Sequence, residues 1–220
     1  VSGNVEIRGN SFTMPEGDVA VRAVFQKNSS GGGGGDSSSD SGDSVSGNSS
    51  KAVSPGSGSY AMEGTWQSDG QGGWKFQKKD GSFAASAWGH INGCWYYFDA
   101  HSNMATGWCS VNGHWYYLNS AEGGGQGAMI SGWYFDPVYQ SWFYLLPEGS
   151  MATGWQLVDG RWYYLNPSAE GTQGAMVTGW QKIGEKWYYL NPEPGAAQGA
   201  MAANTTIDGY YVGVDGARAE

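Results

Sequence analysis

The chain has 220 residues, of which 38 are Gly, 12 are Trp and only 14% are charged, and this composition argues against a protein built from long helices. The formal net charge of −9 argues against nucleic acid or an anionic membrane surface as the main partner. No apolar run approaches the roughly 18 residues that a membrane-spanning helix needs, so membrane insertion is not expected. Frequent Gly beside frequent aromatic residues predicts many short turns between short strands.

The first two segments differ in composition from the rest. Residues 1–27 show apolar alternation on both sides of a turn that contains Pro15 and Gly17, which predicts two strands. The run FTMPEGDVAVRAVF resembles the closing strands of bacterial surface repeats of the internalin B type, and because the chain begins at Val1 we expect the rest of that repeat upstream. Residues 28–59 contain 22 Gly or Ser in 32 positions, which predicts a disordered, flexible linker.

Residues 60–220 form a third segment that repeats with a period of 20 to 25 residues, the range typical of repeat arrays. Each unit begins with Gly-Trp or a close variant and has a second Trp seven to nine residues later. Two further aromatic residues usually follow the second Trp, and a Met precedes the next Gly-Trp. The segment is therefore predicted to stack similar units one after another.

The turn chemistry within each unit predicts a β-hairpin. Asp159-Gly160 and Asn112-Gly113 separate short aromatic runs, and both dipeptides favour the tight turns that join antiparallel strands. Each strand has only about four residues, so a single hairpin is not stable alone and must pack against its neighbours. The expected fold is all-β: a β-hairpin solenoid of about six repeats, with a half-repeat around Tyr210 as a cap.

The pattern GWxxxxGxWYYLN followed by GxMATGW closely resembles the choline-binding repeats of Gram-positive cell-wall proteins and phage lysins. The resemblance covers residues 64 to about 212. It implies a secreted, cell-wall-associated module in which choline or phosphocholine of teichoic acids lies between consecutive hairpins. In that family three aromatic rings surround the choline: both Trp of one repeat and the first Tyr of the next repeat's WYY. The Met between repeats often completes the wall.

Carried over to this chain, the resemblance implies six aromatic boxes: Trp66, Trp74 and Tyr96; Trp88, Trp95 and Tyr116; Trp108, Trp115 and Phe143; Trp133, Trp142 and Tyr163; Trp155, Trp162 and Tyr188; and Trp180, Trp187 and either Tyr210 or Tyr211. We predict Tyr211 as the third wall of the sixth box. The methionines between repeats are Met104, Met129, Met151, Met176 and Met201. Met176 is expected to close the box of Trp155, Trp162 and Tyr188. The second tyrosines of each WYY, at positions 97, 117, 164 and 189, are expected to pack more than they bind.

Aromatic boxes suit choline because a quaternary ammonium has no N–H to donate and is instead attracted to ring faces. Each site would be weak, but several sites that face a polymer repeating the ligand give strong attachment. Two alternatives remain: the rings serve only as packing, or their faces stack on a glucan or other wall glycan. Both are weaker explanations of twelve tryptophans arranged in pairs.

Neither catalysis nor a metal site is expected in this chain. The carboxylates of Asp99, Asp136, Asp159 and Glu185 fall in turns and form no facing pair suited to glycoside hydrolysis, so any catalytic domain would lie upstream. The spacing of His90, Cys94, His101, Cys109 and His114 matches no familiar zinc site, and no cofactor is expected. Whether Cys94 and Cys109 form a disulfide is left open.

Overall fold

The structure is a computed structural model that describes residues 61–123 and 125–219. These residues belong to the second of two units into which the chain divides, residues 1–50 and 51–220. The predicted strands within residues 1–27 and the predicted linker at residues 28–59 lie outside the described residues.

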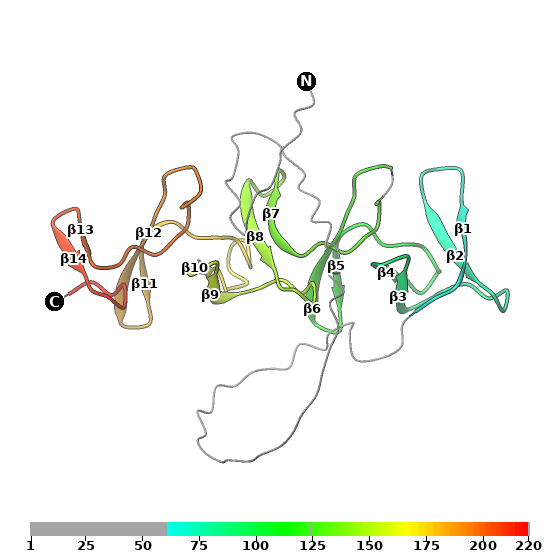
Figure 1. Cartoon of the computed structure of the whole chain (residues 1–220), viewed down its shortest axis with the longest axis horizontal. Helices are drawn as coiled ribbons and strands as arrows, with labels where there is room; N and C mark the ends of the chain where they lie inside the picture. Colours follow the sequence, from blue (N-terminus) through cyan, green and yellow to red (C-terminus); the bar gives the residue numbers. More distant parts are fainter. Residues whose placement is uncertain (1–60, 124, 220) are drawn as a thin grey trace, which may run out of the picture. The chain divides into compact units, whose positions relative to one another are not determined.

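The described residues fold into consecutive β-hairpins, as the sequence predicts, and the hairpins follow one another in chain order (Figure 1). They include no helix long and apolar enough to cross a bilayer. The strands are β1 (Gly64–Ser68), β2 (Trp74–Lys78), β3 (Ala87–Ile91), β4 (Cys94–Phe98), β5 (Gly107–Val111), β6 (His114–Leu118), β7 (Gly132–Asp136), β8 (Ser141–Leu145), β9 (Gly154–Val158), β10 (Arg161–Leu165), β11 (Gly179–Ile183), β12 (Lys186–Leu190), β13 (Thr205–Ile207) and β14 (Tyr210–Val212).

Each hairpin is a two-stranded antiparallel sheet with one aromatic face and one core face. In the β9–β10 hairpin Trp155 lies opposite Tyr164, and Trp162 lies opposite Leu157. These four side chains share one face because side chains alternate along a strand. Tyr163 points to the other face, which is buried against the preceding hairpin. The aromatic face of one hairpin thus packs on the core face of the next.

The turns adopt the backbone conformations that their residues favour. Asn112 and Gly113 have φ of 51° and 81°, and Asp159 and Gly160 have φ of 49° and 75°. Two consecutive positive φ angles define the type I′ turn, whose twist matches that of the flanking strands. The β11–β12 turn has a positive φ at Gly184, the first central position, as a type II′ turn requires.

Hairpins are joined by a backbone hydrogen bond as well as by side chains. After each hairpin from β3–β4 to β11–β12, the loop returns so that its methionine N–H donates to the carbonyl of the second Trp one hairpin earlier, as between Met129, which follows β6, and Trp95 in β4 at 2.8 Å. The same methionine forms a β-bridge with Leu118, which is fully buried. This stacking, repeated along the array, is a β-solenoid of hairpins, as the sequence predicts.

The methionine side chains lie directly against glycines of the following loop. A Cβ atom built at Gly199 would overlap Met176 Sδ, whereas a Cβ at Gly160 would meet no atom within 4 Å. Both glycines have positive φ, 78° and 75°. The two positions therefore carry the same backbone constraint, and only Gly199 carries the packing constraint.

Gly199→Ala should destabilise the array more than Gly160→Ala does. Gly160→Ala should cost about 1 kcal/mol, because an L-residue is strained in the left-handed region. Gly199→Ala should cost about 1–3 kcal/mol more, since Met176 must also move from a packed position. Urea or thermal unfolding of both variants and the parent measures the difference. Equal losses in the two variants would contradict the role given to the Met176 contact.

Candidate functional site

The Gly-Trp tryptophan of each hairpin lies against the first aromatic residue of the next hairpin's WYY or equivalent. The rings meet edge to face, with interplanar angles between 63° and 88°. The sequence-predicted walls that come from different hairpins therefore lie together. The ring centroids are 4.9 Å apart for Trp66 and Tyr96, 4.8 Å for Trp88 and Tyr116, 4.8 Å for Trp108 and Phe143, 4.8 Å for Trp133 and Tyr163, 5.0 Å for Trp155 and Tyr188, and 6.0 Å for Trp180 and Tyr210.

The fifth interface shows how a third ring completes a corner. Trp162 lies 6.3 Å from Trp155 with an interplanar angle of 90°, and Tyr188 meets Trp155 at 71°. Trp155 is therefore roughly perpendicular to both of the other rings. Trp162 is 43% exposed, so part of its ring surface is accessible from solvent. Such a corner offers ring faces to a compact cation whose surface consists of apolar groups.

The sixth interface contains a cavity of about 210 Å³ lined by Trp180, Trp187, Tyr210 and Arg218. Tyr210 is the tyrosine that faces this cavity, so the choice of Tyr211 from the sequence is wrong. Tyr211 is the next residue along β14 and points to the opposite face. Its hydroxyl donates instead to Asn204 Oδ1 at 2.7 Å.

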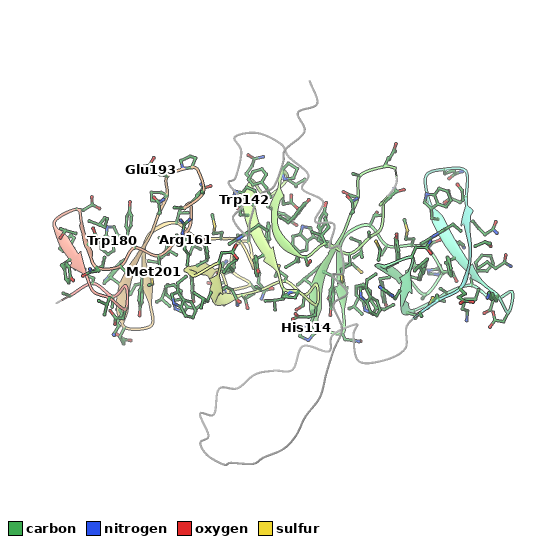
Figure 2. All side chains as sticks on the ribbon, in the orientation of Figure 1. His114, Trp142, Arg161, Trp180, Glu193 and Met201 are labelled. Carbon is green, nitrogen blue, oxygen red and sulfur yellow. The ribbon has the colours of Figure 1, made fainter. Side chains whose placement is uncertain are left out.

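The methionines close the interfaces one unit earlier than expected. Met176 N donates to the carbonyl of Trp142 at 2.8 Å, and its side chain packs in the cluster of Trp133 and Tyr163. Met176 thus belongs to the fourth box, and the expectation that it closes the box of Trp155 and Trp162 is wrong. That fifth box receives Met201, labelled in Figure 2, because Met201 N donates to the carbonyl of Trp162.

The remaining methionines follow the same rule, because each loop that carries a methionine returns over the interface behind it. Met104 N donates to the carbonyl of Trp74, and Met151 N donates to that of Trp115, each at a distance below 2.9 Å. Met104 accordingly packs near Trp66 in the first box. Each box is therefore assembled from three consecutive segments of the chain: one hairpin, the next hairpin and the loop after that.

Burial separates the rings that mainly pack from those that remain accessible. Tyr116, Phe143 and Tyr163 are at most 5% exposed, so the interpretation of packing alone fits these walls. The second tryptophans at positions 115, 162 and 187 are 42–43% exposed. A large apolar ring that is nearly half exposed at the same place in three of the six repeats is not explained by packing alone.

The second tyrosines of each WYY pack against the Gly-Trp tryptophan of their own hairpin. Their ring centroids lie 5.1–5.2 Å from that indole for the pairs Trp88–Tyr97, Trp108–Tyr117, Trp155–Tyr164 and Trp180–Tyr189. The predicted packing role of these tyrosines is consistent with this cross-strand contact.

Two aspartates orient tryptophans of the boxes and were not singled out for this role by the sequence. Trp108 Nε1 donates to Asp136 Oδ2 at 2.7 Å, and Trp180 Nε1 donates to Asp208 Oδ2 at 2.9 Å. Asp136 is 4% exposed and also accepts the backbone N–H of Val138. Both aspartates follow their tryptophan by 28 residues, a spacing that could have been noticed in the sequence.

The cysteines and histidines form no disulfide or metal site in the part of the chain that the structure describes. Cys94 and Cys109 are both free thiols in this structure. Across residues 61–123 and 125–219, no three or more His, Cys, Asp or Glu residues are grouped so as to hold a metal ion.

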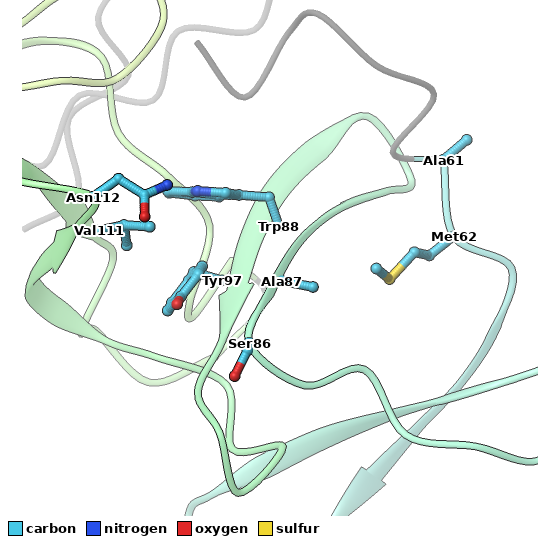
Figure 3. A pocket seen from close by; sticks show the side chains of 8 residues that line it. All are labelled: Ala61, Met62, Ser86, Ala87, Trp88, Tyr97, Val111 and Asn112. Carbon is cyan, nitrogen blue, oxygen red and sulfur yellow. The ribbon is translucent and has the colours of Figure 1, made fainter. Parts of the chain in front are cut away.

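A larger cavity, of about 420 Å³, lies beside the second box (Figure 3). Its lining includes Trp88 and its cross-strand neighbour Tyr97, together with Met62 and Asn112. Trp95 and Tyr116, the other walls expected for the second box, are not part of this lining. Cavity volume therefore does not identify the candidate site here, and the recurring contact between tryptophan and the next hairpin's aromatic ring is the better guide.

Comparison with known proteins agrees with the repeat pattern. A family model described as a choline-binding repeat matches residues 85–125 and 152–205. The chain resembles the structure of choline binding protein F from Streptococcus pneumoniae in the presence of a peptidoglycan analogue, with 37% identity and a TM-score of 0.60, covering 72% of this chain and 47% of that one.

Two further structures from Streptococcus pneumoniae are similar. CbpJ is 35% identical with a TM-score of 0.60, covering 71% of this chain and 48% of that one. The modular autolysin LytC is 34% identical with a TM-score of 0.52, covering 73% of this chain and 33% of that one. The chain thus spans less than half the length of each of these relatives. A comparison with curated protein sequences finds no match.

The third interface should make stability sensitive to alkaline pH. Tyr134 stacks on Tyr117 with ring centroids 3.9 Å apart, and burial, together with the Tyr117 hydroxyl, raises the pKa of Tyr134 above its usual value of 10. Because the folded-state pKa is raised, this contribution to stability is complete below about pH 10 and is lost as the pH rises further.

Tyr134→Phe should therefore lose less stability than the parent between pH 8 and pH 11, as measured by urea unfolding at each pH. Phe135→Leu is the control, since it changes the neighbouring position of β7 without changing any ionisable group. An unchanged pH dependence in Tyr134→Phe would contradict the contribution of Tyr134.

Proposed function

Because residues 85–125 and 152–205 are choline-binding repeats, we propose that this array attaches its protein to the Gram-positive cell wall by binding the choline of teichoic acids. The observation that carries the proposal is the corner formed by two tryptophans and one aromatic residue of the next hairpin, as in Trp155, Trp162 and Tyr188. The contact between the first tryptophan and that aromatic residue recurs with the period of the repeats, and the sixth interface also brings Trp180, Trp187 and Tyr210 together, so one chain would present several sites.

Recognition of choline by such a corner follows from the chemistry of its head group. A trimethylammonium carries a positive charge but no N–H, so hydrogen bonds cannot select it. Its methyl groups can lie against the faces of Trp155 and Trp162, where the electron-rich rings attract the charge. Met201 would cover a further side with a polarizable thioether.

The array compensates for weak individual sites. Each ring contributes roughly 0.5–2 kcal/mol to binding of a cation, which places a three-ring site on the order of millimolar affinity. Teichoic acid repeats the ligand along a polymer, so occupation of one box raises the effective concentration at the next. The overall affinity can then exceed that of a single box by a factor of about 10² or more.

The proposal assigns binding, and no catalysis, to residues 61–219. Similar repeats occur in a choline binding protein and in a modular autolysin, so the same kind of array is found in proteins of different overall activity. Any catalytic activity would reside outside this array. We infer a secreted, cell-wall-associated protein, because the proposed ligand belongs to the wall. A wall glycan that stacks on the exposed tryptophans is the alternative ligand.

Choline should bind the full chain and raise its melting temperature, because a ligand that binds only the folded state stabilises that state. Tyr188→Leu should weaken or remove one site while retaining much of the apolar packing against Trp155. Isothermal titration with choline chloride counts the sites, and retention on an immobilised choline analogue measures attachment. The loss in Tyr188→Leu should be about one site, with modest loss of stability.

Tyr189→Leu is the matched control, because Tyr189 is the adjacent residue but points away from the fifth box and packs against Trp180. It should leave the fifth site intact. Unchanged choline binding in Tyr188→Leu and Trp162→Leu would show that the box assignment is wrong. Failure of choline to bind the parent chain, with binding of a soluble wall glycan, would replace choline by the alternative ligand.

A further inference from the structure

The sixth box differs from the other five in the residue that closes it. In the fifth box the N–H of Met201 donates to the carbonyl of Trp162, and in the sixth box the N–H of Arg218 donates to the carbonyl of Trp187, both at 2.8 Å. Arg218 also forms a β-bridge with Val212, the counterpart of the bridge that each methionine makes to its own hairpin. Arginine thus occupies the backbone position that methionine holds elsewhere.

The surrounding loop is otherwise the same as in the other repeats. Gly199-Ala200-Met201 in one loop corresponds to Gly216-Ala217-Arg218 in the last. A Cβ built at Gly216 would overlap the Met201 side chain, just as a Cβ at Gly199 would overlap that of Met176. The chain therefore follows the same path, and the change is confined to the side chain that enters the box.

The Arg218 side chain places a cation on a ring of its own box. Its Cζ lies 3.6 Å from the centroid of the Tyr210 ring, within the range of a cation–π contact. The cavity of about 210 Å³ is lined by this guanidinium together with Trp180, Trp187 and Tyr210. The face that a bound ammonium would need on Tyr210 is already covered by a positive charge.

Nearby carboxylates do not neutralise this charge within the described residues. Asp215 forms an ion pair with Lys186 at 3.2 Å, and Asp208 accepts the hydrogen bond of Trp180 Nε1. Arg218 has no ion pair with any residue of 61–123 or 125–219. A second cation in the cavity would therefore meet the guanidinium at short range, and their repulsion is comparable with the attraction that a ring provides.

We propose that Arg218 is a built-in cation that occupies the sixth aromatic box and closes it to quaternary ammonium ligands. The inference rests on the proposed function, since it concerns which of its boxes are open. Arg218 is tethered beside Tyr210, so it competes at a high effective concentration against a ligand whose affinity for one box is weak. The boxes that are closed by methionine then stay available to a ligand, and Arg218 determines the specificity of the last.

The test compares the number of choline sites in the full chain and in Arg218→Met, which restores the residue of the other boxes. Isothermal titration with choline chloride should give one more site in Arg218→Met than in the parent. Met201→Arg should close the fifth box and give one site fewer. Lys182→Met is the control, because it removes a positive charge from β11 of the same hairpin and should leave the number of sites unchanged.

An independent measurement uses the parent protein alone. The side-chain protons of Arg218 should show an upfield ring-current shift in NMR spectra that Tyr210→Leu removes, and saturating choline should leave that shift unchanged. Choline-induced loss of the shift, or equal site numbers in the parent and Arg218→Met, would overturn the inference while the other boxes still bind. Absence of choline binding in both proteins would overturn the proposed function and this inference together.

Discussion

The edge-to-face contact between the Gly-Trp indole of one hairpin and an aromatic ring of the next is the interaction on which the array depends. Each described hairpin is a separate two-stranded sheet with strands of at most five residues, and such a hairpin is at best marginally stable alone. Contacts such as that of Trp133 with Tyr163 bury the apolar faces that a single hairpin leaves exposed. Stability is therefore a property of neighbouring pairs.

The same rings that hold the hairpins together also form the candidate binding corners, so stability and ligand binding are coupled. Trp155 packs on Tyr188 with one part of its surface and forms a corner with the more exposed Trp162 with another. A ligand in the corner would add contacts to both hairpins at once. Ligand binding should consequently strengthen the interfaces that create the site.

The interfaces are similar in backbone path but differ in the groups that complete them. The third interface contains the stacked pair of Tyr117 and Tyr134 and a buried Asp136 that holds the Trp108 indole. The sixth replaces methionine by Arg218. Since the backbone hydrogen bonds repeat while these side chains vary, each box can be tuned without disturbing the stack.

The hairpins and their turns were determined by the sequence alone, because turn residues and side-chain alternation act over a few residues. The pairing of Trp155 with Tyr188 was expected from the resemblance to choline-binding repeats, and the structure brings the two rings together. Alternation also places Tyr210 and Tyr211 on opposite faces of β14, but it does not show which of the two faces Trp180, and the prediction of Tyr211 was wrong. Only the tertiary structure decided which box Met176 closes. Its partner, the carbonyl of Trp142, lies 34 residues earlier. Methionine recurs with the period of the repeats, but this period does not show which interface a methionine covers, because stacking of the hairpins sets the path of the loop.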